Sequence, residues 1–320
     1  MDDRERYLQA IGELIERQSY RQALSVCDKA LGVHPHCAEA HDFRGVILCR
    51  LGRYREALPC YEKAILLEPE YVPALLDKAE LLTHHLGDSE GAIALSDRIL
   101  RLEPHELDQA HAYFMKGVAY ANLDDHEEAL PNFRLALELD PDHPEARCEI
   151  GVSLYECYSF GEALKTLRQV IEADPRHPRP HHFIGCLYDQ LGQEELASRA
   201  HGRAAELDSE NYQLPFEIED DDFDAAIEEA VNVLPRRIRR IVKSCETVAR
   251  DRPSNEHLAD GTLRPSAALH FAGTVDGPRI EIYRQSFLRY ARSRARLVED
   301  LAAELRFQIE VRLLEIPERP

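Results

Sequence analysis

Residues 116–141 read KGVAYANLDDHEEALPNFRLALELDP, and this stretch sets the period of the chain. Gly117, Ala129 and Pro141 stand twelve residues apart in it, and the same residue types recur along the sequence. The prolines, spaced 34, 35, 37 and 34 residues apart, are Pro35, Pro69, Pro104, Pro141 and Pro175. Twelve residues before each proline, and before Ser209, stand Ala23, Ala57, Ala92, Ala129, Ala163 and Ala197. Six copies in one phase predict an array of six similar units.

The small residues indicate that each unit is a pair of helices. Two helices approach closely only where Gly or Ala faces the partner helix, and larger apolar residues then fill the gaps between pairs. The glycines in the expected first helices are Gly45, Gly117, Gly151 and Gly185. Each proline stops a second helix, because proline cannot donate the helical hydrogen bond and restricts the residue before it.

This pattern resembles the tetratricopeptide repeat. We predict six such repeats in residues 1–212, an acidic linker at 213–222 and a separate domain at 223–320. The resemblance implies a mainly α fold, a right-handed superhelix of helix pairs. It also implies a concave groove that binds peptides or protein surfaces, and no chemistry of its own.

The resemblance places the groove on the first helix of each pair. The predicted groove positions are Asp42, Phe43, Asp77, Lys78, Phe114, Met115, Glu149, His182 and Phe183. Some relatives grip a C-terminal carboxylate with Lys, Asn and Arg, but Lys78 is the one positive side chain in this set, so we expect no such clamp. The aromatic residues indicate either apolar sockets rimmed by acidic groups or packing within the array. The sockets would suit a basic or amphipathic protein partner.

Composition excludes several other classes of function. The chain has 59 acidic and 39 basic residues, a net charge of −20, which disfavours general nucleic-acid binding. It contains no apolar run long enough for a bilayer and no secretory signal, so we expect a cytoplasmic protein without a membrane partner. Eight cysteines without a Cys-x-x-Cys pair predict reduced thiols and no cysteine-based zinc site. The histidines complete no ligand set by spacing, and we expect no cofactor.

The composition changes after the repeats. The linker QLPFEIEDDD is acidic, whereas residues 223–320 carry 17 basic groups against 15 acidic ones. This contrast allows the C-terminal domain to dock on its own acidic repeats.

The C-terminal domain is predicted to be α+β. Helical spacing marks residues 223–234, and a basic helix follows Pro235. Strands are expected at 246–249, 269–272 and 279–283, with a helical turn at 286–290. Apolar residues every four positions predict a long last helix, and they are Leu297, Leu301, Leu305, Ile309 and Leu313.

Several short sequence segments, taken in their order along this domain, carry a second resemblance. They include Leu234-Pro235, Arg250-Asp-Arg-Pro-Ser254 and Pro278-Arg-Ile-Glu-Ile-Tyr-Arg284. They resemble the minimal zincin-like metallopeptidase family of bacteria. The resemblance implies a His-Glu-x-x-His motif on the last helix, in which two histidines hold zinc and the glutamate activates water.

The chain departs from this motif. Phe307, Gln308 and Val311 occupy the ligand and base positions, and no histidine follows His270. We therefore expect a pseudo-metallopeptidase without zinc or catalysis, in which Phe307 and Val311 extend the apolar stripe of the last helix.

The sequence favours a non-catalytic cytoplasmic adaptor or scaffold, with the C-terminal domain as a second interaction surface. Two alternatives stay open. One is a peptidase-like hydrolase acting through an unrecognised site in the C-terminal domain. The other is a regulatory partner of an active homologue.

Overall fold

The computed structural model describes residues 2–214, 216–259, 262–274, 277–288 and 291–315. The chain divides into two compact units, Met1–Ser153 and Leu154–Pro320. Each unit is described by itself.

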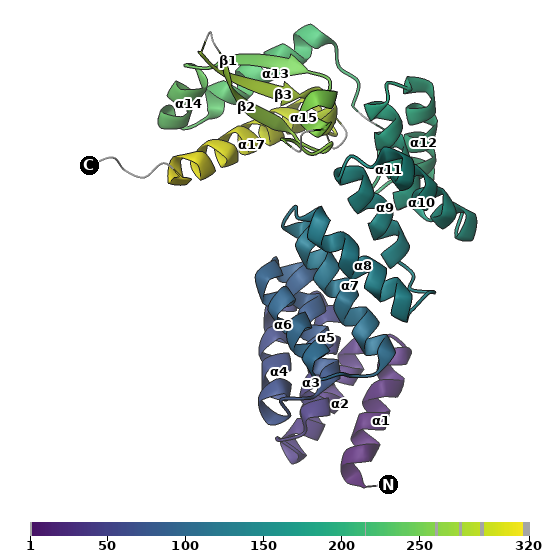
Figure 1. The fold of residues 1–320 in the computed structure, drawn as a ribbon. Coiled ribbons are helices and arrows are strands. Elements are labelled where there is room, and N and C mark those ends of the chain that lie inside the picture. The colour runs from purple at the N-terminus through teal and green to yellow at the C-terminus, as the bar shows by residue number, and fades with distance from the viewer. Residues whose placement is uncertain (1, 215, 260–261, 275–276, 289–290, 316–320) are drawn as a thin grey trace. The chain divides into compact units, whose positions relative to one another are not determined.

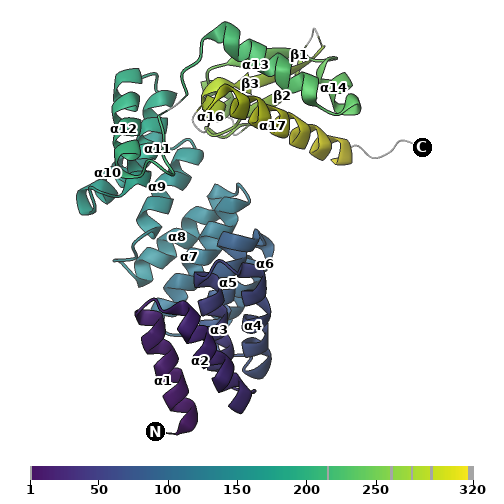
Figure 2. The same cartoon turned by 180° about the vertical axis from the view of Figure 1, so that it is seen from behind.

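The first unit is a stack of antiparallel helix pairs (Figures 1 and 2). Its helices are α1 (Asp3–Glu16), α2 (Tyr20–Val33), α3 (Ala38–Arg50), α4 (Tyr54–Leu67), α5 (Val72–Leu81), α6 (Ser89–Arg101), α7 (Glu106–Asn122) and α8 (His126–Leu139). The next helix, α9 (Ala146–Glu156), spans the boundary between the units. The first helices of neighbouring pairs also touch, α1 with α3, α3 with α5, and α5 with α7.

The small residues of the repeat lie where the sequence predicts them. The six period-marking alanines are all buried, at 0 to 2% exposure. Gly45 on α3 faces the Tyr61 ring on α4, and Gly117 on α7 faces the Phe133 ring on α8. A Cβ atom at Gly117 would lie 2.6 Å from Phe133 Cε1, closer than real Cβ atoms approach a neighbour. Glycine therefore sets the spacing of the two helices within these pairs.

The third pair is irregular. A π-helical turn, η1 (Leu82–Leu86), extends α5, and Thr83 Oγ1 donates to the Ala79 carbonyl at 2.7 Å. Gly87 ends this turn with a φ of 69°, a left-handed conformation that favours glycine.

The second unit begins with the last helix pairs. After α9 come α10 (Phe160–Ala173), α11 (Pro178–Gln190) and α12 (Glu194–Leu207), so the chain carries the six predicted pairs within its described residues. Gly185 on α11 faces the His201 ring on α12, which repeats the contact seen at Gly45 and Gly117.

A small α+β region follows the last pair. It comprises α13 (Asp220–Val233), α14 (Arg236–Val242), β1 (Glu246–Arg250), α15 (Asn255–Ala259), β2 (Leu269–Thr274), β3 (Gly277–Tyr283), α16 (Arg284–Leu288) and α17 (Arg294–Glu315). The sheet order is β1-β3-β2, with β1 parallel and β2 antiparallel to β3. Every element predicted from the sequence is present, and α15 is an addition.

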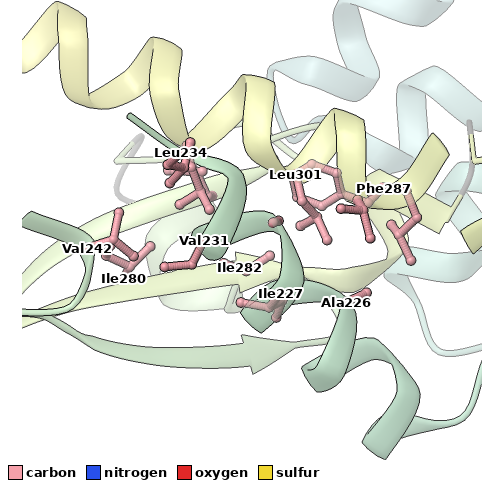
Figure 3. Packing of buried hydrophobic residues seen from close by; sticks show 14 of the residues in the cluster. Ala226, Ile227, Val231, Leu234, Val242, Ile280, Ile282, Phe287 and Leu301 are labelled. Carbon is pink, nitrogen blue, oxygen red and sulfur yellow. The ribbon is translucent and has the colours of Figure 1, made fainter. Parts of the chain in front are cut away.

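The core of this region lies between the sheet and the helices α13 and α17 (Figure 3). Ala226, Ile227 and Val231 from α13 meet Ile280 and Ile282 from β3. The predicted stripe of α17 points into this core, because Leu297, Leu301, Leu305 and Ile309 are buried. The Leu313 side chain lies outside the described part of the chain.

Within the second unit, the α+β region is hydrogen-bonded to the last helix pairs. Ser266 Oγ donates to Glu156 Oε2 at 2.7 Å, and Gln190 Nε2 donates to the Pro265 carbonyl at 3.0 Å. The Arg252 guanidinium also donates to the Asp189 carbonyl. The residues between β1 and β2 are therefore hydrogen-bonded to polar groups of α9 and α11.

None of the helices in the described ranges combines the length and apolar character that a membrane span requires.

Candidate functional site

Two carboxylic acids meet where the first helices of the second and third pairs touch. Asp42 lies on α3 and Asp77 on α5, and their side chains share a hydrogen bond. Asp42 is only 4% exposed, and its Oδ1 atom has no hydrogen-bond partner. Within the described ranges, no Lys or Arg forms an ion pair with either carboxyl. We call these two residues the carboxyl pair.

Burial and mutual repulsion favour a shared proton in the carboxyl pair. Burial raises the pKa of Asp42, and the neighbouring charge of Asp77 raises it further. Burial also raises the pKa of Asp77, assisted by the charge of Glu80. Two carboxyls this close in a desolvated site cannot both ionise at low cost. The pair therefore holds a proton in a pH range where ordinary aspartates have lost theirs.

This shared proton predicts a pH-dependent stability. A carboxyl whose folded pKa is raised destabilises the fold as pH rises, here from about pH 4 to about pH 8. Asp42→Asn keeps the shape without the charge, so we expect it to be more stable than wild type at pH 8 by about 1 to 3 kcal/mol. The difference should vanish near pH 4.

Urea unfolding of wild type and variant across this pH range measures the effect. The exposed Glu16→Gln serves as the matched control and should leave the pH profile unchanged. Equal slopes for wild type and Asp42→Asn would contradict a raised pKa at the carboxyl pair.

The positive side chain among the predicted groove positions has a partner elsewhere. Lys78 Nζ on α5 lies 3.1 Å from Glu62 Oε1 on α4. Lys78 therefore forms its ion pair outside the carboxyl pair. The charge of Arg50 acts to lower the pKa of Asp77, but burial outweighs it and the pKa of Asp77 is raised.

The predicted aromatic positions differ in exposure. Phe114 and Met115 on α7 are 4% and 2% exposed. The Phe114 ring packs against His143, with ring centroids 4.4 Å apart, and against Phe133 at 5.8 Å. Phe43 is half-buried beside the core of the first pair. Phe114 and Met115 thus contribute to packing within the array, and the side chain of Phe43 is the more accessible of the three.

The remaining groove positions are divided between the units. Glu149 lies in the first unit and is buried. His182 and Phe183 on α11 belong to the second unit, where His182 is buried and Phe183 is half-buried. The Arg179 guanidinium lies 5.7 Å from the centre of the Phe183 ring. Whether these positions bind a partner stays a prediction.

The degenerate zinc positions require one correction. Phe307 and Val311 do not extend the buried stripe of α17, because their exposed fractions are 59% and 36%. The core side of α17 is set by Leu301, Leu305 and Ile309, and a residue at position 307 points away from that side. Gln308 Nε2 donates to Glu304 Oε1 at 2.9 Å, one turn earlier on the same helix.

Among the residues that the structure describes, no group of three or more His, Cys, Asp or Glu side chains stands in positions that could hold a metal ion.

The second unit contains an open cavity that the sequence did not predict. Its volume is about 1030 Å³. Its walls come from α11 and α12, from the linker, and from the α+β region. The lining residues are Asp189, Glu194, Ser198, His201, Leu214, Phe216, Glu217, Ile218, Glu219, Asp222, Asp251, Arg284, Gln285, Leu288 and Arg294. We call it the linker cavity.

Comparison with known proteins identifies the repeats. Residues 38–71 and 110–143 match tetratricopeptide repeat models. The chain is 30% identical over 131 residues to the UDP-N-acetylglucosamine–peptide N-acetylglucosaminyltransferase of Giardia intestinalis, a match that covers 40% of this chain and 8% of that protein. It is 34% identical over 118 residues to the FK506-binding protein-like protein of Mus musculus, covering 34% of this chain and 32% of that protein. The chain thus spans less than a third of either relative.

Solved structures share the helix-pair architecture. PilF of Pseudomonas aeruginosa superposes with a TM-score of 0.57 at 17% identity, covering 64% of this chain and 92% of that one. PilW, a type IV pilus biogenesis factor, gives 0.59 at 18% identity, covering 64% and 94%. A tetratricopeptide repeat protein from Parabacteroides merdae gives 0.54 at 18% identity, covering 71% and 84%. At these identities the likeness shows the fold alone.

Matched repeats and shared architecture agree. The chain is a tetratricopeptide repeat protein, mainly α, with a small C-terminal α+β region that contains a three-stranded sheet.

Proposed function

We propose that this protein is an adaptor or scaffold that binds a protein or peptide partner through the first-helix face of its repeats. Tetratricopeptide repeat proteins mediate protein–protein interactions. The first helices α1, α3, α5 and α7 touch in succession, so their side chains form one continuous surface.

The carboxyl pair, which forms no ion pair with Lys or Arg within the described residues, carries this proposal. A buried carboxyl group without a cationic partner destabilises the fold when it is charged. A Lys or Arg side chain of a partner at Asp77, which is partly exposed, would remove the mutual repulsion and stabilise both carboxylates. Binding would then release the shared proton, and affinity would rise with pH across neutrality. The partner segment that fits this surface is basic.

The C-terminal region supplies a second surface rather than zinc chemistry. At the positions where the zincin-like resemblance places the zinc motif, Phe307 and Val311 offer no ligand atom and Gln308 offers no base. We propose that it performs no metal-dependent peptide hydrolysis. The purified protein should therefore contain zinc well below one atom per chain and cleave no peptide from a mixed library. Stoichiometric zinc together with activity that a chelator abolishes would contradict this.

Affinity capture from the native host, followed by mass spectrometry, tests the adaptor proposal. Wild type should enrich at least one protein that the double variant Asp42→Asn/Asp77→Asn fails to retain. The control Glu16→Gln/Glu90→Gln removes two exposed carboxylates from the same unit and should retain it. If the double variant captures every protein that wild type captures, the carboxyl pair is not part of a binding surface.

A further inference from the structure

The linker cavity has an apolar floor. Leu214, Phe216 and Ile218 line it from the linker, and Leu288 lines it from the end of α16. Leu214 is well exposed, whereas Phe216 and Ile218 also pack against the core of the α+β region and Leu288 is buried in it. Exposed apolar surface inside a concave site is the usual feature of a ligand or partner pocket.

Carboxylates without an ion pair surround this floor. Asp189 pairs with His201 at 2.8 Å, Arg284 pairs with Asp220, and Arg294 pairs with Glu229. The other acidic lining residues form no ion pair within the described part of the chain, and they are Glu194, Glu217, Glu219, Asp222 and Asp251. The rim is therefore strongly negative and attracts a cationic partner.

We propose that the linker cavity binds a short basic peptide segment that carries one large apolar side chain. The apolar side chain lies on the floor of Leu214, Phe216 and Ile218. Flanking Lys or Arg residues pair with the rim carboxylates. This site goes beyond the proposed function, because it belongs to the second unit and does not use the carboxyl pair.

Fluorescence anisotropy with the full chain tests the proposal. The probe is a fluorescein-labelled peptide, Gly-Lys-Arg-Leu-Arg-Lys-Gly, compared with the same peptide carrying serine in place of leucine. The triple variant Glu217→Gln/Glu219→Gln/Asp222→Asn should weaken binding about tenfold or more. The matched triple variant Glu16→Gln/Glu90→Gln/Glu138→Gln loses the same charge from exposed positions in the first unit and should bind within about twofold of wild type. Leu214→Ser should weaken the leucine peptide and leave the serine peptide unchanged.

Each of the following three outcomes would overturn the proposal. If the two triple variants lose the same affinity, the peptide is attracted to net charge rather than to a site. If the leucine and serine peptides bind equally well, the apolar floor of the cavity takes no part in binding. If Asp42→Asn/Asp77→Asn is the one variant that weakens peptide binding, the peptide binds on the first-helix face. That result would support the adaptor proposal and refute this one. Circular dichroism of the linker variants, all at surface positions, excludes unfolding as the cause of any loss.

Discussion

Gly117→Ala is expected to lower the free energy of unfolding by about 2 to 3 kcal/mol, although alanine is the better helix former. The added Cβ would lie 2.6 Å from Cε1 and 2.7 Å from Cδ1 of Phe133. Phe133 is fully buried, so its ring has no free space to move into. Helices α7 and α8 must therefore separate, and the packing between them is lost.

Gly12→Ala is the matched control for this prediction. Gly12 lies inside α1, and nothing stands within 4 Å of the Cβ that alanine would add. We expect a gain of up to about 1 kcal/mol, because alanine restricts the unfolded chain more than glycine does. Urea denaturation measures whether the free energy of unfolding falls in Gly117→Ala and rises in Gly12→Ala. If both glycines respond alike, close approach does not set the helix spacing.

Leu301→Ala is expected to destabilise the C-terminal region by about 2 to 5 kcal/mol. Leu301 on α17 is fully buried in the core that α17 forms with α13 and the sheet (Figure 3). Removing most of its side chain leaves a cavity in that core. Phe307→Ala, six residues later on the same helix, should stay within about 0.5 kcal/mol of wild type, since the Phe307 side chain is mostly exposed.

Thermal unfolding of these two variants checks the orientation of α17. A large loss for Phe307→Ala with little loss for Leu301→Ala would mean that the helix presents its other side to the core.

The array could be predicted because its determinants are local and repeated. The alanine at the Ala129 position recurs in all six pairs, and the proline at the Pro141 position recurs in five of them. Both residue types have a steric reason for their place. The strands β1 and β3 were also evident from short β-rich segments. The helix α15 was missed because it has only five residues and lies in a polar stretch.

Spacing predicted the buried stripe of α17, but it did not show that Phe307 and Val311 lie outside that stripe. Leu301 and Leu305 form one apolar stripe, and Phe307 with Val311 forms a second at the same interval. The packing of α13 and the sheet selects the first stripe, and that selection depends on tertiary contacts rather than on periodicity.

The candidate sites were predicted unequally. Asp42 and Asp77 stand one repeat apart, so the repeat alignment placed both on the first-helix face. Their shared proton depends on burial, which the sequence does not specify. The linker cavity was missed because residues such as Asp189, Glu217 and Arg284 are distant in sequence and meet only in the folded second unit.

The affinity of a captured partner for the full chain tests the central claim most directly. Isothermal titration calorimetry at neutral pH should give a Kd about tenfold or more weaker for Asp42→Asn/Asp77→Asn than for wild type. The control Glu16→Gln/Glu90→Gln should match wild type. Equal Kd values for wild type and the carboxyl-pair variant would contradict the claim that this protein recognises a basic partner through Asp42 and Asp77.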